Sequence, residues 1–251
     1  MNDFVVVIPA RYASVRLPGK PLRLIAGKPM LQHVHERAAE SRASEVIIAT
    51  DDRRIAAAAE AFGAKVCMTA EHHQSGTDRL AEVSRRCGWP KHKAVVNLQG
   101  DEPLMPAGLI NQCAGLLAAP EVGMATLASP FLSREEFDDP NVVKVILDTH
   151  GDALYFSRAA IPYARSPANA SLAMGSALHH HGIYAYRVEV LQRVVAAERS
   201  PLEQAEQLEQ LRALALGVKI RVGRPEQRPG PGVDTEADLA RVAKKLGVED
   251  D

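Results

Sequence analysis

Three short runs of apolar residues, rich in valine and isoleucine, place the strongest constraint on how this chain can fold. They occupy residues 4–8, 46–49 and 94–98. Each run is continuously apolar rather than alternating, which is typical of strands buried on both faces of a parallel sheet. The segments between them have helical patterns, at about residues 29–40, 52–62 and 77–87. This β-α-β-α-β order predicts an α/β protein with a doubly wound, mostly parallel central sheet of the Rossmann type.

The second half of the chain is more mixed. Strand-like segments occur at residues 142–147, 182–186 and 218–222. Residues 158–173 are rich in proline, alanine and serine, which is typical of a loop. Because no stretch is long enough to link two independent domains, we expect one domain over residues 1–251 with a smaller inserted lobe at about residues 130–190.

The start of one helix is marked clearly by its sequence. Ser200 can cap the helix, Pro201 suits its first position, and Glu203 completes an S-x-x-E capping box. Gly217 is typical of a helix end, so one helix is predicted between Pro201 and that glycine. A last helix is predicted over residues 235–246.

Charge and composition exclude several classes of function. Thirty basic residues balance thirty-one acidic ones, so no bulk field draws the chain to nucleic acid or to an anionic membrane. No apolar run approaches the ~18 residues of a membrane-spanning helix, and the N-terminus lacks the features of a signal peptide. The three cysteines form no C-x-x-C pair, which argues against a disulfide framework or a zinc site. We therefore expect a cytoplasmic protein without nucleic-acid or membrane partners.

The loop after the first predicted strand concentrates positive charge. Arg11, Arg16 and Lys20 lie at the expected carboxyl end of a parallel strand, where open α/β sheets bind ligands. Such a loop can bind a triphosphate through guanidinium forks, an ammonium and backbone N–H groups. It is not a Walker A loop, because Gly19-Lys20 is followed by Pro21 rather than by serine or threonine. On charge alone, a solvated basic loop is an equal alternative.

Two later aspartates are candidate metal ligands. Asp101 follows a predicted strand and can present its oxygens to a hard cation, while nearby Gln99 can bond a base or a sugar hydroxyl. Asp234 precedes the last predicted helix, where it is either a second metal ligand or the helix N-cap. Capping is favoured from this stretch alone, although Thr235 with Asp238 could supply the cap instead and leave Asp234 for a ligand.

Six segments, taken in order, closely resemble the 3-deoxy-manno-octulosonate (Kdo) cytidylyltransferases, also called CMP-Kdo synthetases. They are residues 8–22, 74–79, 97–103, 181–187, 206–212 and 233–235. The match extends from about residue 4 to about residue 246. The resemblance implies a nucleotidyltransferase-like fold and the transfer of CMP from CTP to the anomeric hydroxyl of Kdo, with release of pyrophosphate. It also implies a Mg²⁺ cofactor, a homodimer and a place in lipopolysaccharide biosynthesis.

The resemblance further implies roles for individual residues. By similarity, the CTP phosphates are bound by Arg11, Ser14, Arg16 and Lys20, the cytidine by Ser75, Gly76, Thr77, Arg79 and Gln99, Mg²⁺ by Asp101 and Asp234, and the sugar acid by Arg158, His181, Tyr184, Glu209 and Gln210. The catalytic group comprises Arg16, Lys20, Asp101 and Asp234, because charge neutralisation and hydroxyl activation are what this reaction requires. The resemblance also implies that the inserted lobe contributes to sugar binding and dimerisation.

Some residues depart from the family pattern, and others are expected to have a structural rather than a catalytic role. Val15 stands where the family usually has a small hydroxyl residue. In the histidine run 179–181 only His181 matches the family, and a metal site there is disfavoured because adjacent strand residues point to opposite faces. Residues 72–73, also histidines, are expected in a loop, and residues 51–52, both aspartates, are expected to cap the following helix.

Three alternatives stay open at this point. A cytidylyltransferase for 8-amino-Kdo or a sialic acid would have the same motifs. A non-catalytic nucleotide-sensing protein on this fold is disfavoured, since a simple binder does not need both metal carboxylates together with the phosphate-binding cations. A glycosyltransferase is disfavoured by the lack of a clear D-x-D motif after the central strand.

Overall fold

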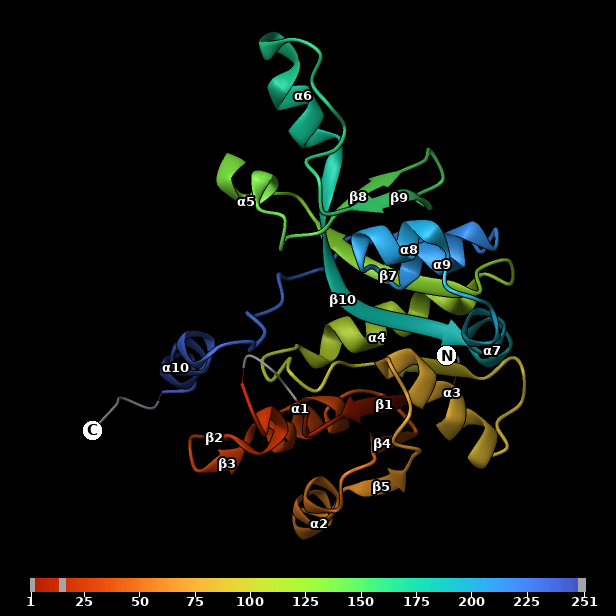
Figure 1. Cartoon of the computed structure of the whole chain (residues 1–251), viewed down its shortest axis with the longest axis vertical. Helices are drawn as coiled ribbons and strands as arrows, with labels where there is room; N and C mark the ends of the chain where they lie inside the picture. Colours follow the sequence, from red (N-terminus) through yellow and green to blue (C-terminus); the bar gives the residue numbers. More distant parts are fainter. Residues whose placement is uncertain (1–2, 14–16, 248–251) are drawn as a thin grey trace.

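The computed structural model describes residues 3–13 and 17–247 of the 251-residue chain. Within these residues a nine-stranded sheet has the order β11-β7-β10-β6-β1-β4-β5, with β8 paired to β10 and β9 paired to β8 (Figure 1). Its strands are β1 (Phe4–Ala10), β4 (Glu45–Thr50), β5 (Lys65–Met68), β6 (Ala94–Asn97), β7 (Met124–Ser129), β8 (Lys144–Leu147), β9 (Ala153–Ser157), β10 (Ala177–Arg187) and β11 (Ile220–Gly223). A separate hairpin comprises β2 (Leu24–Ile25) and β3 (Lys28–Pro29).

The sheet is parallel around β1 and antiparallel around β10. β1 pairs in parallel with β4 on one side and with β6 on the other, and β4 pairs in parallel with β5. β7 and β11 are also parallel, whereas β10 runs antiparallel to both β6 and β7. The predicted α/β fold with a mostly parallel central sheet is therefore confirmed. The direction of β10 is a feature that the hydrophobic pattern did not predict.

Helices cover both faces of this sheet (Figure 1). The α-helices are α1 (Met30–Ala39), α2 (Arg53–Ala61), α3 (Gly76–Arg86), α4 (Ala107–Gly115), α5 (Arg134–Asp138), α6 (Ala170–Gly175), α7 (Val188–Ala196), α8 (Pro201–Glu206), α9 (Gln210–Ala215) and α10 (Glu236–Lys245). Short 3-10 helices occur at η1 (Lys20–Leu22), η2 (Leu116–Ala118) and η3 (Pro167–Asn169). Helices α1, α2, α3 and α10 begin and end within one residue of the bounds predicted from the sequence.

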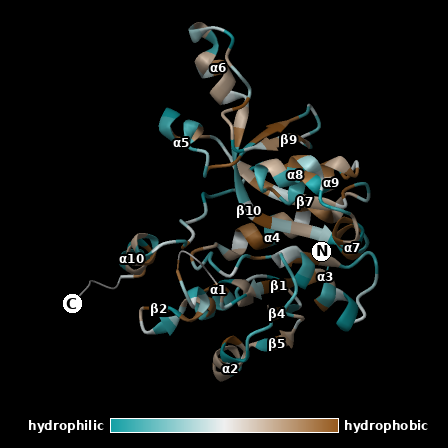
Figure 2. Cartoon of the chain, viewed as in Figure 1, coloured by the Kyte–Doolittle hydropathy of each residue, from teal (hydrophilic) through white to brown (hydrophobic). Residues whose placement is uncertain are grey.

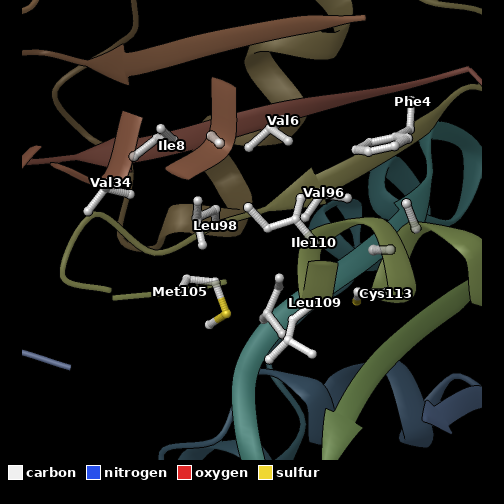
Figure 3. Packing of buried hydrophobic residues seen from close by; sticks show 14 of the residues in the cluster. Phe4, Val6, Ile8, Val34, Val96, Leu98, Met105, Leu109, Ile110 and Cys113 are labelled. Carbon is white, nitrogen blue, oxygen red and sulfur yellow. The ribbon is translucent and has the colours of Figure 1, made fainter. Parts of the chain in front are cut away.

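Side chains of β1 alternate between two hydrophobic cores. Phe4, Val6 and Ile8 pack with α1, α2 and α4 on one face, as part of the cluster that Figure 3 shows. Val5 and Val7 pack with α3, α7 and α9 on the other face. Burial on both faces explains why the run is apolar without alternation. Figure 2 shows hydrophobic residues concentrated in the interior and hydrophilic ones in the peripheral helix α5.

The segment predicted as an inserted lobe contains α5, β8, β9 and α6, which project from one end of the sheet (Figure 1). Strand β10 runs from this projection into the central sheet, where it pairs with β6 and β7, so the projection is continuous with the sheet. Its predicted roles in sugar binding and dimerisation stay predictions. Among the described residues, no helix has the length and apolar character needed to cross a membrane.

The prediction of a single helix after Ser200 is wrong, because two helices, α8 and α9, form there. Ser200 caps α8 as expected, accepting a hydrogen bond from the Glu203 N–H (3.1 Å). The helix ends at Glu206, and Gln207 adopts a left-handed conformation with φ 53°. The Glu206 carboxylate accepts hydrogen bonds from the Ser157 hydroxyl (2.6 Å) and the Arg158 N–H (2.8 Å). This tertiary anchor holds the end of α8 against the residues at the end of β9.

Candidate active site

A cleft of about 740 Å³ opens at the carboxyl edge of the parallel strands. Because β1 lies between β4 and β6, the loops that follow β1 and β6 leave the sheet side by side, at the point where the strand order reverses. The predicted site residues that line this cleft are Arg11, Lys20, Ser75, Gly76, Arg79, Gln99, Asp101, Glu209 and Asp234. Ser14 and Arg16 lie outside the described residues, so their predicted roles stay predictions.

Lys20 joins the two predicted metal ligands. Its Nζ donates to Asp101 Oδ2 (2.7 Å), to Asp234 Oδ1 (3.0 Å) and to the Val233 carbonyl oxygen (2.9 Å). Gly19 precedes the lysine with a φ of 65°, a left-handed conformation that glycine adopts without steric cost. This turn directs Lys20 into the cleft, and the two carboxylates lie close enough together to share one cation.

Charge in this cluster shifts two pKa values. Burial lowers the pKa of Lys20, but the Asp101 and Asp234 carboxylates outweigh it, so the pKa lies above its usual value. For Glu102, burial and then the negative charges of Asp101 and Asp234 raise the pKa to about 8. Two carboxylates, those of Asp101 and Asp234, therefore share the Lys20 ammonium, and the neighbouring Glu102 carboxyl group is largely protonated at neutral pH.

Asp234 is not the N-cap of the last helix. Thr235 caps α10 by accepting from the Asp238 N–H (3.2 Å), and the Asp238 carboxylate accepts from the Thr235 N–H (2.8 Å), which forms a capping box. The Asp238 carboxylate also accepts from the Asp234 N–H (3.0 Å). Of the two arrangements that the sequence left open, the structure has the one in which Asp234 points its carboxylate toward the cleft.

Two glycines let the edge of the cleft pack closely against Pro9. A Cβ added to Gly100 would lie 2.9 Å from the Pro9 carbonyl oxygen, and one added to Gly76 would lie 3.0 Å from the Pro9 ring. Both distances are shorter than van der Waals contact. Ser75 caps α3, accepting from the Asp78 N–H (3.2 Å). The turn after β6 and the start of α3 are thus held against the end of β1.

Arg79 lines the cleft, and residues that lie outside the cleft hold its guanidinium in place. Its guanidinium donates to the Thr69 hydroxyl (2.6 Å) and lies 2.8 Å from the Asp51 carboxylate. The neighbouring Asp52 caps α2 by accepting from the Arg54 N–H (2.8 Å). The expectation that both aspartates cap the helix therefore holds for Asp52 and is wrong for Asp51, which is the counter-ion of Arg79.

The family model described as Cytidylyltransferase matches residues 5–220, which include β1, β6 and most of the residues that line the cleft. The chain belongs to the cytidylyltransferase family.

Solved structures agree with this assignment. This cytidylyltransferase is 46% identical to CMP:2-keto-3-deoxy-manno-octonic acid synthetase, solved in complex with CTP, with a TM-score of 0.89; the match covers 98% of this chain and 99% of that one. The fold is shared with a cytidylyltransferase from Leptospira borgpetersenii serovar Hardjo-bovis, at 16% identity and a TM-score of 0.60, covering 98% and 96% of the two chains. It is also shared with 4-diphosphocytidyl-2C-methyl-D-erythritol synthase from Anaerococcus prevotii, at 12% identity and a TM-score of 0.64, covering 98% and 97%.

Glu209 lines the cleft next to the start of α3. Burial raises the pKa of its carboxyl group, and the side chains of Thr77 and Ser75 at the start of α3 lie near it and oppose this shift. Thr77, predicted to contact the cytidine, lies behind the cleft and lines a small adjoining pocket together with Glu209 and Gln210. Tyr184 is buried, and its hydroxyl has no hydrogen-bond partner in the structure. A buried hydroxyl without a partner is uncommon in native proteins, but Tyr184 lines neither the main cleft nor either of two smaller cavities among the described residues.

The other two predicted sugar contacts lie elsewhere. Tyr184 packs in the hydrophobic core on the α3, α7 and α9 side of the sheet, and the pairing of β10 with β7 is irregular between His181 and Tyr184. The His181 Nε2 lies 2.9 Å from the Ser129 hydroxyl, in a second cavity of about 300 Å³. The Arg158 guanidinium donates to the carbonyl oxygens of Glu206 (2.8 Å) and Pro140 (3.2 Å) and does not line the main cleft. The structure therefore does not bring the five predicted sugar contacts together.

His73 lines the cleft, although the sequence indicated only a loop residue. Its Nε2 is hydrogen-bonded to the Glu82 carboxylate, which also accepts from the Ala70 N–H (2.9 Å) and from Arg86 (2.7 Å). A histidine two residues before a predicted nucleotide-binding segment was the available signal. Its counter-ion on α3 could not be identified without the fold.

Asp101 and Asp234 fit a Mg²⁺ ion that keeps water and phosphate ligands. In the part of the chain that is described, no three histidine, cysteine or acidic side chains form a metal cluster. Mg²⁺ at phosphate-transfer sites commonly uses only one or two carboxylates, with waters and phosphate oxygens completing the octahedron. The pair already shares one cation, the Lys20 ammonium, so its geometry is compatible with a shared ion.

Proposed function

We propose that this cytidylyltransferase transfers CMP from CTP to the anomeric hydroxyl of Kdo, giving CMP-Kdo and pyrophosphate. The observation that carries the proposal is the cluster of Lys20, Asp101 and Asp234 at one end of a nucleotide-sized cleft. The similarity to a CMP:Kdo synthetase along nearly the whole chain supports the same substrates here.

CTP binds through cationic and amide side chains that line the cleft. Arg11 and Lys20 line the cleft, and we assign them to the phosphates, where they would stabilise the charge that develops on the departing pyrophosphate. The Gln99 amide and the Arg79 guanidinium supply donors for the cytidine. Arg79 meets the nucleotide in a fixed orientation because Asp51 holds it. We assign Ser14 and Arg16 to the phosphates on the resemblance alone.

The reaction needs positioning and charge neutralisation more than covalent chemistry. The anomeric oxygen forms a bond to the α-phosphorus while the bond to pyrophosphate breaks, and no enzyme-bound intermediate is required. When bound by Asp101 and Asp234, Mg²⁺ would neutralise phosphate charge and lower the pKa of the attacking hydroxyl. The chain itself orients the two carboxylates, through the capping box after Asp234 and the tight turn around Gly100.

On the sugar side, Glu209 is the strongest candidate, because it lines the cleft. Tyr184 is assigned on the resemblance alone, since its hydroxyl is buried in the hydrophobic core. Gln210 lies one residue beyond Glu209 and lines the adjoining pocket. Arg158 and His181 are weaker candidates, because their polar atoms bond to other protein groups outside the main cleft.

The assembly and location of the enzyme follow as part of this proposal. We expect a homodimer, supported by apolar side chains on the projecting segment that are largely exposed, among them Leu132 (78% exposed), Leu154 (60%), Tyr163 (88%) and Leu172 (69%). We place the reaction in the cytoplasm, where CTP is available, and its product in lipopolysaccharide assembly.

The test is pyrophosphate release from purified protein with CTP and Mg²⁺. Kdo, 8-amino-Kdo and a sialic acid are added in separate reactions, each with and without EDTA. Release that depends on Kdo and stops with EDTA is the expected result. Asp101→Asn should abolish release while the protein stays folded. Asp138→Asn, which alters an exposed carboxylate on α5, is the matched control and should behave as the wild type.

Other outcomes would change specific parts of the proposal. Release with only another sugar acid would keep the reaction and change its acceptor. Release that persists in EDTA, or in the Asp101→Asn variant, would contradict the metal site. CTP binding without release for any acceptor would overturn the enzymatic function and favour a nucleotide-sensing protein.

A further inference from the structure

All three N–H donors of the Lys20 ammonium are used within the protein. They bond to the carboxylate of Asp101, to the carboxylate of Asp234 and to the carbonyl oxygen of Val233, at 2.7, 3.0 and 2.9 Å. An ammonium has three donors and no acceptor, so this set is complete. In this arrangement Lys20 cannot add a bond to a phosphate without giving up one of these three.

The arrangement conflicts with what the proposed reaction requires of the same residues. CTP binding calls for Lys20 on the phosphates, and a divalent ion calls for Asp101 and Asp234. An ion shared by these two carboxylates would stand next to the ammonium that they already share. Two cations in such proximity repel each other strongly in a partly desolvated site. Lys20 and the divalent ion therefore compete for one place.

The two carboxylates do not depend on Lys20 for their positions. The Val233 N–H donates to the Asp101 carbonyl oxygen (2.9 Å), which holds the two segments together through the backbone. The Val233 side chain is buried among apolar residues that include Ile25 and Val242. The Arg23–Glu236 ion pair (2.7 Å) adds a further link to α10. The acidic pair therefore stays in place when the lysine leaves it.

Lys20 is able to leave. Its stem is a flexible chain of four carbons, and the residue lines the open cleft rather than the hydrophobic core. The phosphates of a nucleotide bound in that cleft would offer the ammonium new acceptors of high negative charge. The bonds from Lys20 to the two carboxylates would then be lost, and a metal ion could take the place of the ammonium.

We propose that Lys20 is an exchangeable cation of the active site, which occupies the Asp101–Asp234 pair until nucleotide phosphates draw it away and a divalent ion replaces it. The inference rests on the proposed function, because it takes the cleft as a nucleotide site. It makes binding of the divalent ion dependent on the nucleotide. The enzyme alone binds the ion weakly, and the enzyme with CTP binds it tightly.

The test measures binding of Mn²⁺, a paramagnetic stand-in for Mg²⁺, by electron paramagnetic resonance in solutions without nucleotide. Removing the competing charge in Lys20→Met should tighten Mn²⁺ binding by about tenfold or more over the wild type. Lys20→Arg keeps a cation and should not tighten it to the same extent. Addition of CTP at saturating concentration should tighten binding strongly in the wild type and much less in Lys20→Met.

Two further variants locate the ion and guard against a folding defect. Combining Lys20→Met with Asp101→Asn should remove the gained affinity, and Mn²⁺ that stays tightly bound would place the ion elsewhere and overturn the proposal. Lys20→Gln replaces Lys20→Met if thermal unfolding reveals a misfolded protein. Equal Mn²⁺ affinity in the wild type and in the folded neutral variant would also overturn the exchange. If the wild-type enzyme nevertheless releases pyrophosphate with CTP and Kdo, the proposed function would stand and only the exchange would fail. Failure of the exchange can therefore be distinguished from failure of the proposed function.

Discussion

The Arg79 Nη2 lies 2.8 Å from the Asp51 Oδ2, so an aspartate just after β4 orients an arginine of α3 at the edge of the cleft. The Arg79 side chain is 4% exposed and that of Asp51 is 19% exposed, which makes this pair one of the less solvated ion pairs of the described structure. A charge-assisted hydrogen bond in such surroundings is stronger and more directional than one at the surface. Asp51 therefore fixes the position of the Arg79 guanidinium at the cleft.

Removing the charge of Asp51 should weaken nucleotide binding. We expect Asp51→Asn to raise the KM for CTP by roughly five- to tenfold with a smaller change in kcat, because loss of one charge-assisted bond is worth about 1–1.5 kcal/mol. Asp52→Asn is the control, since asparagine also caps helices well and the cap on α2 should persist. Equal KM values for the two variants would contradict the positioning role of Asp51.

A methyl group at position 100 should disturb the active-site turn. The added Cβ of Gly100→Ala would lie 2.9 Å from the Pro9 backbone oxygen, so the turn that holds Gln99 and Asp101 must shift. We expect a loss of roughly 1–3 kcal/mol in the free energy of unfolding and a large fall in kcat/KM.

The matched control for this change is Gly108→Ala in α4, where nothing lies within 4 Å of the added Cβ. Alanine favours a helix by up to about 1 kcal/mol over glycine, so this variant should be as stable as the wild type or more so. Urea unfolding and steady-state kinetics measure both effects. A fully active Gly100→Ala enzyme would exclude a steric role for this glycine.

The buried ion pair between Arg212 and Glu203 should be essential for stability. The guanidinium donates two hydrogen bonds to the carboxylate, at 2.6 and 2.8 Å, and both side chains are less than 8% exposed. Arg212→Met leaves a carboxylate buried without its partner, which typically costs about 3–5 kcal/mol. The loss should appear in urea unfolding, and the Glu203→Met/Arg212→Met double variant should recover much of it.

The exposed pair of Arg134 and Asp138 on α5 provides a comparison. Arg134→Met should leave the free energy of unfolding nearly unchanged, because exposed ion pairs contribute little. If Arg212→Met were as stable as this control, the buried pair would have no special role in joining α8 to α9.

Acidification should destabilise the fold through two buried histidines. Burial is the main cause that lowers the pKa of His180 and of His181 to about 3, from a usual value of about 6.5. Between these values the unfolded chain binds protons that the folded protein excludes, so stability is complete above about pH 6.5 and falls as the pH decreases toward 3. At about pH 5.5 each histidine should cost roughly 1.4 kcal/mol.

A variant at His181 tests this origin of the acid sensitivity. Glutamine does not titrate but can still bond the Ser129 hydroxyl, which lies 2.9 Å from the histidine Nε2. His181→Gln should therefore lose about 1.4 kcal/mol less than the wild type between about pH 7.5 and about pH 5.5, measured by urea unfolding at both values. Equal losses would show that His181 is protonated as readily in the folded protein as in the unfolded chain.

Sequence patterns anticipated that most of the residues predicted to bind the nucleotide would lie together. The continuous apolar runs predicted β1, β4 and β6, and strand ends in a parallel sheet necessarily bring their following loops to one edge. Arg11, Lys20, Gln99 and Asp101 were therefore expected together, and all four line the cleft. The residues predicted to bind the sugar were anticipated less well, because His181 lines a second cavity, Tyr184 is buried in the core and Arg158 bonds to Glu206.

Local sequence was sufficient for features that depend on neighbouring residues. The fold class and the bounds of several helices were predicted from apolar periodicity, capping residues and the order of elements. These features depend on contacts between residues that are close together in the sequence. Tertiary structure alone decided which side chains meet. Lys20 bonds to residues 81 and 214 positions away, and Asp51 rather than Asp52 pairs with Arg79. The break between α8 and α9 likewise depends on a carboxylate anchored at β9. Such contacts depend on how strands order and pack in three dimensions, and no local pattern encodes that order.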